Sequence, residues 1–168
     1  MIKTLMSIAV LLVLCNQPAV AAEGEGGLVT FRAMTTELAL QAAQAALASC
    51  RKSGYQIAVA IVDRGGNVQV VLRDRFAGPH TPNTAISKAW TAVSFRTDTT
   101  ELADLSQAGQ PQSGVRNVPG ALMIGGGKTI ESAGSIVGGI GISGAPGGDA
   151  DDVCAVAGIE AISDTLNF

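Results

Sequence analysis

The stretch that decides the fold is Gly134–Ile159, which reads GSIVGGIGISGAPGGDADDVCAVAGI. Its apolar run Ser135–Ser143 predicts a buried strand, and the glycines and proline of Gly144–Gly148 end that strand. Three aspartates at positions 149–152 then fill the first turn of a helix, where acidic side chains meet the positive end of the helix dipole. A strand, a corner without large side chains and a helix N-terminus together predict a close approach of the backbone to another group.

The N-terminal residues have the features of a secretory signal peptide. Lys3 gives a positive start, Leu5–Leu14 is apolar, and Ala19–Ala21 supplies small residues that suit cleavage. The apolar run is too short to span a bilayer. We therefore expect residues 1–22 to be removed, which leaves a periplasmic or secreted protein with no membrane span.

Length, charge and cysteine content narrow the class of protein. The 168 residues favour one domain, which we place at 35–168 after a flexible segment at 23–34. The net charge is −3 and the basic residues are scattered, which argues against nucleic acid as a partner. Once Cys15 leaves with the signal peptide, Cys50 and Cys154 remain. An even pair in an oxidising compartment predicts a disulfide, and two buried free thiols are the alternative.

Hydrophobic periodicity and turn signals predict the element order α-β-β-α-α-β-β-β-α. No repeated βαβ crossover joins the strands. This favours an α+β fold, with about five antiparallel strands and the N- and C-terminal helices packed on them. The helices are expected from Thr35 or Thr36 to Lys52, from Thr81 or Thr84, after Asp98, and from Gly147 or Gly148 to Thr165. The strands are expected at Tyr55–Val62, Val68–Arg73, Gly120–Ile124, Lys128–Ser132 and Ser135–Ser143.

The first predicted helix has an apolar stripe. Leu40, Ala43, Leu47 and Cys50 recur at helical spacing and predict one buried face. If this helix and the last helix share one face of the sheet, Cys50 meets Cys154. Such a bond would contribute about 4–5 kcal/mol as a chain-entropy upper figure.

The second predicted helix has an apolar face made by Ile86, Ala89, Trp90 and Val93. Lys88 lies off that face.

Several short motifs could indicate a cofactor, a metal or a hydrolase site, but none is complete. The letters of Gly139–Gly144 match G-x-G-x-x-G, but no second strand ending in an acid follows, so we expect these glycines to let the strand and the last helix pack closely. The three aspartates lack calcium-loop spacing, and no G-x-S-x-G elbow is present. One histidine and two cysteines are too few for a structural zinc site.

His80 is the only histidine of the chain. One imidazole suffices as an axial ligand of haem, and Met34, Met123 and Tyr55 are alternative ligands. A loop histidine without a special role is the other interpretation.

Three cations flank the loop that contains His80. Arg73, Arg75 and Lys88 are candidates to meet carboxylates of a ligand, and a solvated rim is the alternative for each.

Three segments together resemble a known family. GGIGISGAPGGDADDVCAVAGIEAI at 138–162 resembles the C-terminal signature of the GlcG/HbpS-like haem-binding and haem-degrading proteins. AVAIVDRGGNVQVVLRDRFA at 58–77 resembles their first hairpin. AISKAWTAVSFRTDTTEL at 85–102 resembles their A-x-x-K-A-x-T-A helix, with Lys88 at the lysine position. The likeness covers roughly Leu38–Ile162.

The resemblance implies an antiparallel sheet with helices against it and homo-oligomers built from dimers. It also implies that exported members bind haem, and scavenge, sense or degrade it, whereas cytoplasmic relatives accompany glycolate or cobalamin genes. The signal peptide groups this chain with the exported kind. The family motif does not supply an axial ligand here, so the prediction of His80 as iron ligand comes from the residue types alone. The prediction of the cysteine pair likewise does not come from the family.

We therefore expect an exported haem-binding protein, and leave open whether it is an enzyme. His80 is the predicted iron ligand, and the three cations named above are predicted to meet the propionates. The expected close-approach backbone is at Gly144, Gly147 and Gly148. One alternative is a non-catalytic oligomeric module that binds another exported protein or a sensor protein. The other is a protein that acts on a small organic acid, as in glycolate utilisation.

Overall fold

The computed structural model describes residues 27–167, so the predicted signal peptide at 1–22 lies outside the described residues. Residues 27–31 belong to an N-terminal unit of their own, and Arg32–Phe168 is the compact unit described below. Within the described part of the chain, no helix has the length and apolar character needed to cross a membrane.

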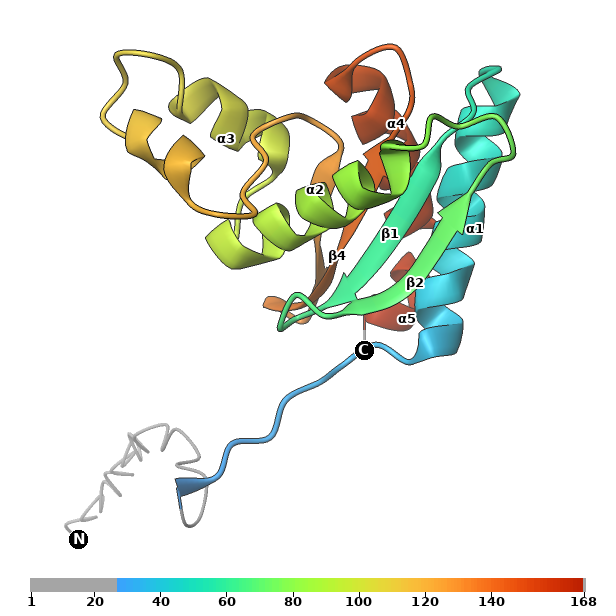
Figure 1. Ribbon diagram of the computed structural model, residues 1–168. Helices are drawn as coiled ribbons and strands as arrows, with labels where there is room; N and C mark the ends of the chain where they lie inside the picture. The colour runs from blue at the N-terminus through green and yellow to red at the C-terminus, as the bar shows by residue number, and fades with distance from the viewer. Residues whose placement is uncertain (1–26, 168) are drawn as a thin grey trace, which may run out of the picture. The chain divides into compact units, whose positions relative to one another are not determined.

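A four-stranded antiparallel sheet with the order β2-β1-β4-β3 forms the middle layer (Figure 1). The strands are β1 (Ala58–Asp63), β2 (Val68–Arg73), β3 (Gly127–Ser132) and β4 (Ser135–Ser143). β1 pairs on both sides, so that Ala60 lies opposite Val71 in β2 and Gly141 in β4. The predicted α+β class with an antiparallel sheet is confirmed.

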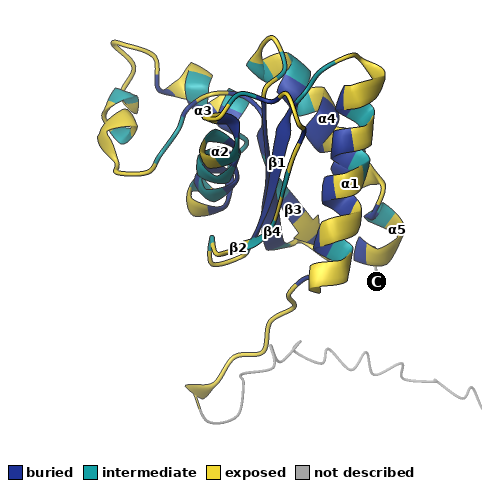
Figure 2. Ribbon diagram, turned by 45° about the vertical axis from the view of Figure 1, so that its right-hand side comes forward, coloured by how far each residue is buried: buried dark blue, intermediate teal, exposed yellow. Residues whose placement is uncertain are grey.

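Helices cover both faces of this sheet (Figure 2). On one face lie α1 (Thr36–Lys52), α4 (Gly148–Glu160) and the short α5 (Ser163–Leu166). On the other face lies α2 (Thr81–Phe95), followed by α3 (Thr99–Leu105) and the 3-10 helix η2 (Ser113–Asn117). The element order is α-β-β-α-α-β-β-α, plus α5.

The fifth strand predicted at Gly120–Ile124 is not formed. This segment is irregular, and its Leu122 N–H donates to Thr91 Oγ1 of α2 at 2.9 Å. A helix side chain, and not a neighbouring strand, therefore binds this backbone N–H. The sheet has four strands in the described residues.

The N-cap of α1 is Thr35, whose Oγ1 accepts from Leu38 N at 3.2 Å, as one of the two predicted caps. The predicted buried stripe is wrong at Leu40, which is 37% exposed. The buried face is rotated toward alanines, because small side chains let the helix backbone lie close to the sheet. Its members are Ala39, Ala42, Ala43, Ala46, Leu47 and Cys50.

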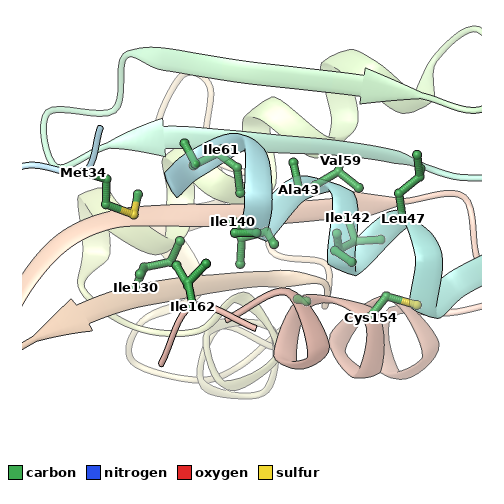
Figure 3. Close-up of a cluster of buried hydrophobic side chains, with 14 of the residues drawn as sticks. Met34, Ala43, Leu47, Val59, Ile61, Ile130, Ile140, Ile142, Cys154 and Ile162 are labelled. Carbon is green, nitrogen blue, oxygen red and sulfur yellow. The ribbon is translucent and has the colours of Figure 1, made fainter. Parts of the chain in front are cut away.

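The main core fills the space between the sheet and the pair α1 and α4 (Figure 3). Branched side chains of the strands, such as Ile61 and Ile140, meet the small face of α1. Cys50 of α1 is bonded to Cys154 of α4, with 5.5 Å between their Cα atoms. The predicted disulfide, and the shared sheet face on which it depended, are confirmed.

On the face of β4 that packs against α2, there is no room for side chains at Gly139 and Gly141, the first two glycines of the G-x-G-x-x-G match. A Cβ on Gly139 would lie 2.7 Å from Val93 Cγ2, and one on Gly141 would collide with the Ala85 carbonyl oxygen. Both obstacles belong to α2. The predicted close packing is present, but the neighbour is α2 and not the last helix as expected.

Candidate functional site

A cavity of about 340 Å³ lies where the start of α2, the end of β4 and the start of α4 meet. We call it the corner pocket. Its walls come from α2, from the irregular segment before β3, from Ser143 at the end of β4, and from the corner and first turn of α4. It therefore lies at the stretch that the sequence marked for close backbone approach.

One wall of the corner pocket is a stripe of α2. His80, Thr84 and Lys88 are spaced four residues apart, which places them one above another on a helix. His80 is the exposed N-cap residue of α2, and its carbonyl accepts from Thr84 Oγ1 at 3.0 Å. A Cβ on Gly78 would lie 2.8 Å from His80 Cε1. The absence of a side chain at Gly78 therefore lets the imidazole lie against the loop.

The inner end of the corner pocket holds a buried ion pair. Lys88 Nζ lies 2.7 Å from Asp151 Oδ2, and the two side chains are only 2% and 5% exposed. The other carboxylate oxygen of Asp151 accepts from Ala145 N at 3.0 Å. Burial raises the pKa of the Asp151 carboxyl above its ordinary value, although the hydrogen bond and charge of Lys88 oppose that shift.

Lys88, which was predicted to lie off the apolar face of α2, is nevertheless buried. A lysine is buried only when a partner compensates its charge, and that partner comes from α4, 63 residues further along the chain. Ile86 and Trp90, predicted for the apolar face, are only half-buried.

Glycines let the chain pass directly over this ion pair. A Cβ on Gly126 would lie 2.6 Å from Asp151 Cβ and 2.9 Å from Lys88 Nζ. The Gly126 N–H donates to Asp152 Oδ1 at 2.8 Å. Asp151 and Asp152, predicted as helix-dipole acids, therefore also bind specific groups: Asp151 at the inner end of the pocket, and Asp152 at Gly126 beside it.

The α4 wall contains two of the three predicted close-approach glycines. Gly147 is the N-cap of α4, and a Cβ there would meet nothing within 4 Å. Gly148 also lines the pocket and packs against Gly125, whose Cα would lie 2.8 Å from an added Cβ. Gly144 does not line the pocket, but its φ of +129° forms the turn between β4 and this wall.

The predicted arginines lie outside the corner pocket. Arg73 donates through Nη2 to the Ala77 carbonyl, within the loop that leads to α2. Arg75 lies in the same loop and is exposed. Of the three predicted cations, Lys88 alone lines the pocket in the described residues.

The alternative iron ligands lie elsewhere too. Met34 is buried in the core on the α1 side of the sheet, and Tyr55 packs against that same core. Met123 lies between Leu122 and Ile124, which line the corner pocket, but Met123 itself is buried and does not line the pocket. Among the ligands considered from sequence, His80 is the one that the structure places at the corner pocket.

Sequence reasoning missed the role of Asp151 and the apolar wall made by Leu122 and Ile124. A signal for the ion pair was present, because Lys88 lies in an alanine-rich helix and the aspartates lie in a small-residue helix. Nothing in the sequence alone indicated which aspartate would meet Lys88.

A family model described as haem-degrading protein, HbpS-like, matches residues 34–160. This range includes every element that forms the corner pocket.

Solved structures agree with this match. A double mutant of Streptomyces reticuli HbpS is 41% identical, with a TM-score of 0.76 over 87% of this chain and 97% of that one. A complex described as PduOC with haem is 32% identical, with a TM-score of 0.73 over 78% of this chain and 96% of that one. This chain is thus similar to HbpS and to PduOC in both fold and sequence.

Among curated proteins, the corrinoid adenosyltransferase PduO of Salmonella typhimurium is 35% identical over 106 residues. The match covers 62% of this chain and 32% of PduO, so this chain spans about a third of that relative's length.

Proposed function

We propose, from the premise that this chain belongs to the HbpS-like family of haem-degrading proteins, that it is an exported protein that binds haem in the corner pocket. One observation carries the proposal: His80 and Lys88 lie on one stripe of α2 and line the same cavity. An imidazole is a common axial ligand of haem iron, and an ammonium attracts a propionate. The haem complex of the relative PduOC supports the ligand class.

The residues of the pocket fit the group. Leu122, Ile124 and Ala145 give the macrocycle apolar surface, and Ile124 is 48% exposed at the rim. A volume of about 340 Å³ is within the range of small-molecule pockets, and its open rim leaves room for a ligand that extends beyond it. Haem, when bound, supplies a redox-active iron whose reactivity is set by its axial ligand and its surroundings.

His80 and Lys88 have separate tasks in this proposal. Eight residues of helix place them about 12 Å apart along the axis of α2. His80, exposed at the rim, would hold the iron, while Lys88, fixed by Asp151, would face a carboxylate at the inner end. Arg73, the last residue of β2, and Arg75, in the loop that follows, both precede His80. They would meet a propionate only of a haem that extends past the rim.

Export is part of the proposal. The signal-like sequence at 1–22 supports it, and so does the Cys50–Cys154 disulfide, because disulfides persist in oxidising compartments.

A pocket-filling substitution tests the location. Thr84→Trp places a large ring between His80 and Lys88 without altering either, and Ser94→Trp, on the exposed side of α2, is the matched control. In a haem titration followed by the Soret band, we expect saturable binding to the wild type and to Ser94→Trp, and weakened binding to Thr84→Trp. Equal binding by all three proteins would place haem elsewhere.

A second candidate function is the binding of a small organic acid, which the buried Lys88 ammonium favours. It predicts that a short carboxylate such as glycolate binds the protein in calorimetry, that Thr84→Trp weakens this binding, and that Ser94→Trp leaves it unchanged. If glycolate does not bind, this candidate is removed and the haem proposal is unaffected.

A further inference from the structure

A second cavity, of about 380 Å³, lies at the opposite ends of α2 and β4. We call it the turn pocket, because three turns of the chain surround it. Arg64 comes from the β1–β2 turn, Arg96 from the end of α2, and Gly134 and Ser135 from the β3–β4 turn. Figure 1 shows the β1–β2 and β3–β4 turns together at the lower end of the sheet.

Charges of both signs line the turn pocket. The side chains of Arg96 and Glu131 are exposed, and neither forms an ion pair with any residue in the described range 27–167. Arg64 adds a second guanidinium to the lining. Two residues supply apolar surface between the charges: Val93, which is 8% exposed, and Ile136, which is half-buried.

The backbone around this pocket is unusual. Arg96 has a φ of 54° and Ala133 a φ of 48°, and these are the non-glycine residues with positive φ in the described part of the chain. Arg96 lines the turn pocket, and Ala133 directly precedes Gly134 and Ser135, which also line it. A helix C-cap in this conformation usually has glycine or asparagine. Arginine at this strained position is accounted for if its side chain binds a ligand.

We propose that the turn pocket binds an α-amino acid with an aliphatic side chain, in its zwitterionic form. The carboxylate would accept hydrogen bonds from the Arg96 guanidinium, whose fork suits a carboxylate. The ammonium would donate to Glu131, and the side chain would lie on Val93 and Ile136. A ligand with only a carboxylate would leave Glu131 without a partner, and a ligand with only an ammonium would leave Arg96 without one, so a ligand with both charges matches the two exposed groups. This site is independent of the haem proposal, because it shares no lining residue with the corner pocket.

Three probes of similar shape test the need for both charges. L-Leucine carries both, 4-methylpentanoate lacks the ammonium, and 3-methylbutylamine lacks the carboxylate. In calorimetric titrations of the mature protein without haem, we expect L-leucine to bind saturably and about tenfold or more tightly than either analogue. No binding of L-leucine in the millimolar range, or equal binding of all three probes, would overturn the proposal.

Two variants assign the charges to residues. Arg96→Gly removes the guanidinium and suits the positive φ, so it keeps the fold, and we expect it to lower the affinity for L-leucine by about tenfold or more. Glu131→Gln should weaken L-leucine but leave 4-methylpentanoate unchanged or bound more tightly. Lys52→Ala, exposed at the end of α1, is the control and should bind as the wild type does. Wild-type affinity in Arg96→Gly would contradict the assignment.

Discussion

Lys88 Nζ lies 2.7 Å from Asp151 Oδ2, and this ion pair joins two helices that cover opposite faces of the sheet. Lys88 belongs to α2 and Asp151 to the first turn of α4. Because both groups are buried, each depends on the other to offset the loss of hydration. The same pair lines the inner end of the corner pocket, so the proposed ligand site includes a contact on which the fold depends.

Removing one partner of this pair should therefore lower the stability of the fold. We expect Lys88→Met or Asp151→Leu to lower the free energy of unfolding by about 3–5 kcal/mol, because an uncompensated charge stays buried. The double variant should lose less than the sum of the two single losses. Urea unfolding of the three variants measures this, and strictly additive losses would show that the two side chains do not interact.

The contact between β4 and α2 leaves no room for a side chain at Gly141. We expect Gly141→Ala to destabilise the protein by about 1–3 kcal/mol or more, since a Cβ would push against the Ala85 carbonyl. Gly114→Ala is the matched control, because an added Cβ there meets nothing within 4 Å and the change should stay within about 0.5 kcal/mol. Thermal unfolding compares the two variants, and an equal Tm for both would contradict the packing described for β4.

The disulfide should contribute a large part of the stability. Cys50 and Cys154 are 104 residues apart, so the bond restricts a long loop in the unfolded chain. We expect the double variant Cys50→Ala/Cys154→Ala to lose about 2–5 kcal/mol in guanidinium unfolding. Dithiothreitol should lower the unfolding midpoint of the wild type and leave that of the double variant unchanged. A wild-type midpoint that does not respond under fully reducing conditions would argue against this contribution.

The β1–β2 turn predicts a pH dependence. Burial by itself would raise the pKa of Asp63, but hydrogen bonds from Asn67, Gly65 and Gly66 outweigh it and hold the pKa below its ordinary value. A carboxyl with a lowered pKa in the folded state stabilises the protein above its unfolded pKa. That contribution disappears as the pH falls through the folded pKa.

We therefore expect Asp63→Asn to be less stable than the wild type at neutral pH, with the difference shrinking below about pH 4. Urea unfolding of both proteins across this pH range measures it. A difference that is constant with pH would assign the loss to geometry and not to the charge.

Local patterns predicted most of the fold. The hairpin turn at 63–67, the cap at Thr35 and the strand Ser135–Ser143 follow from turn chemistry and from runs of apolar residues, and all three are formed. Asp98 is at the predicted N-cap position, but its carboxylate binds Lys128 Nζ at 2.9 Å and not its own helix. Such long-range partners are set by tertiary packing, which a periodicity does not encode.

The candidate site likewise has residues that local chemistry predicted and residues that only the tertiary packing reveals. His80, Lys88 and the glycines at 147 and 148 were chosen from local chemistry, and they line one pocket. Asp151 as the partner of Lys88 was missed, because buried lysines are rare and the pairing depends on how α2 and α4 approach each other. The strand predicted at 120–124 is not formed, and its Leu122 N–H binds the side chain of Thr91 in α2, a tertiary contact that a run of apolar residues does not encode. The homo-oligomer implied by the resemblance stays a prediction.

Ligand rescue tests the central claim, that His80 holds the iron of haem bound in the corner pocket. His80→Gly removes the imidazole at an exposed N-cap position where glycine is tolerated, so the fold should be retained. We would record the Soret spectrum of the haem complex of this variant with and without added imidazole. We expect a shifted spectrum and weaker haem binding in the variant, both restored toward wild type by imidazole. A variant whose spectrum and affinity already equal those of the wild type would contradict ligation by His80.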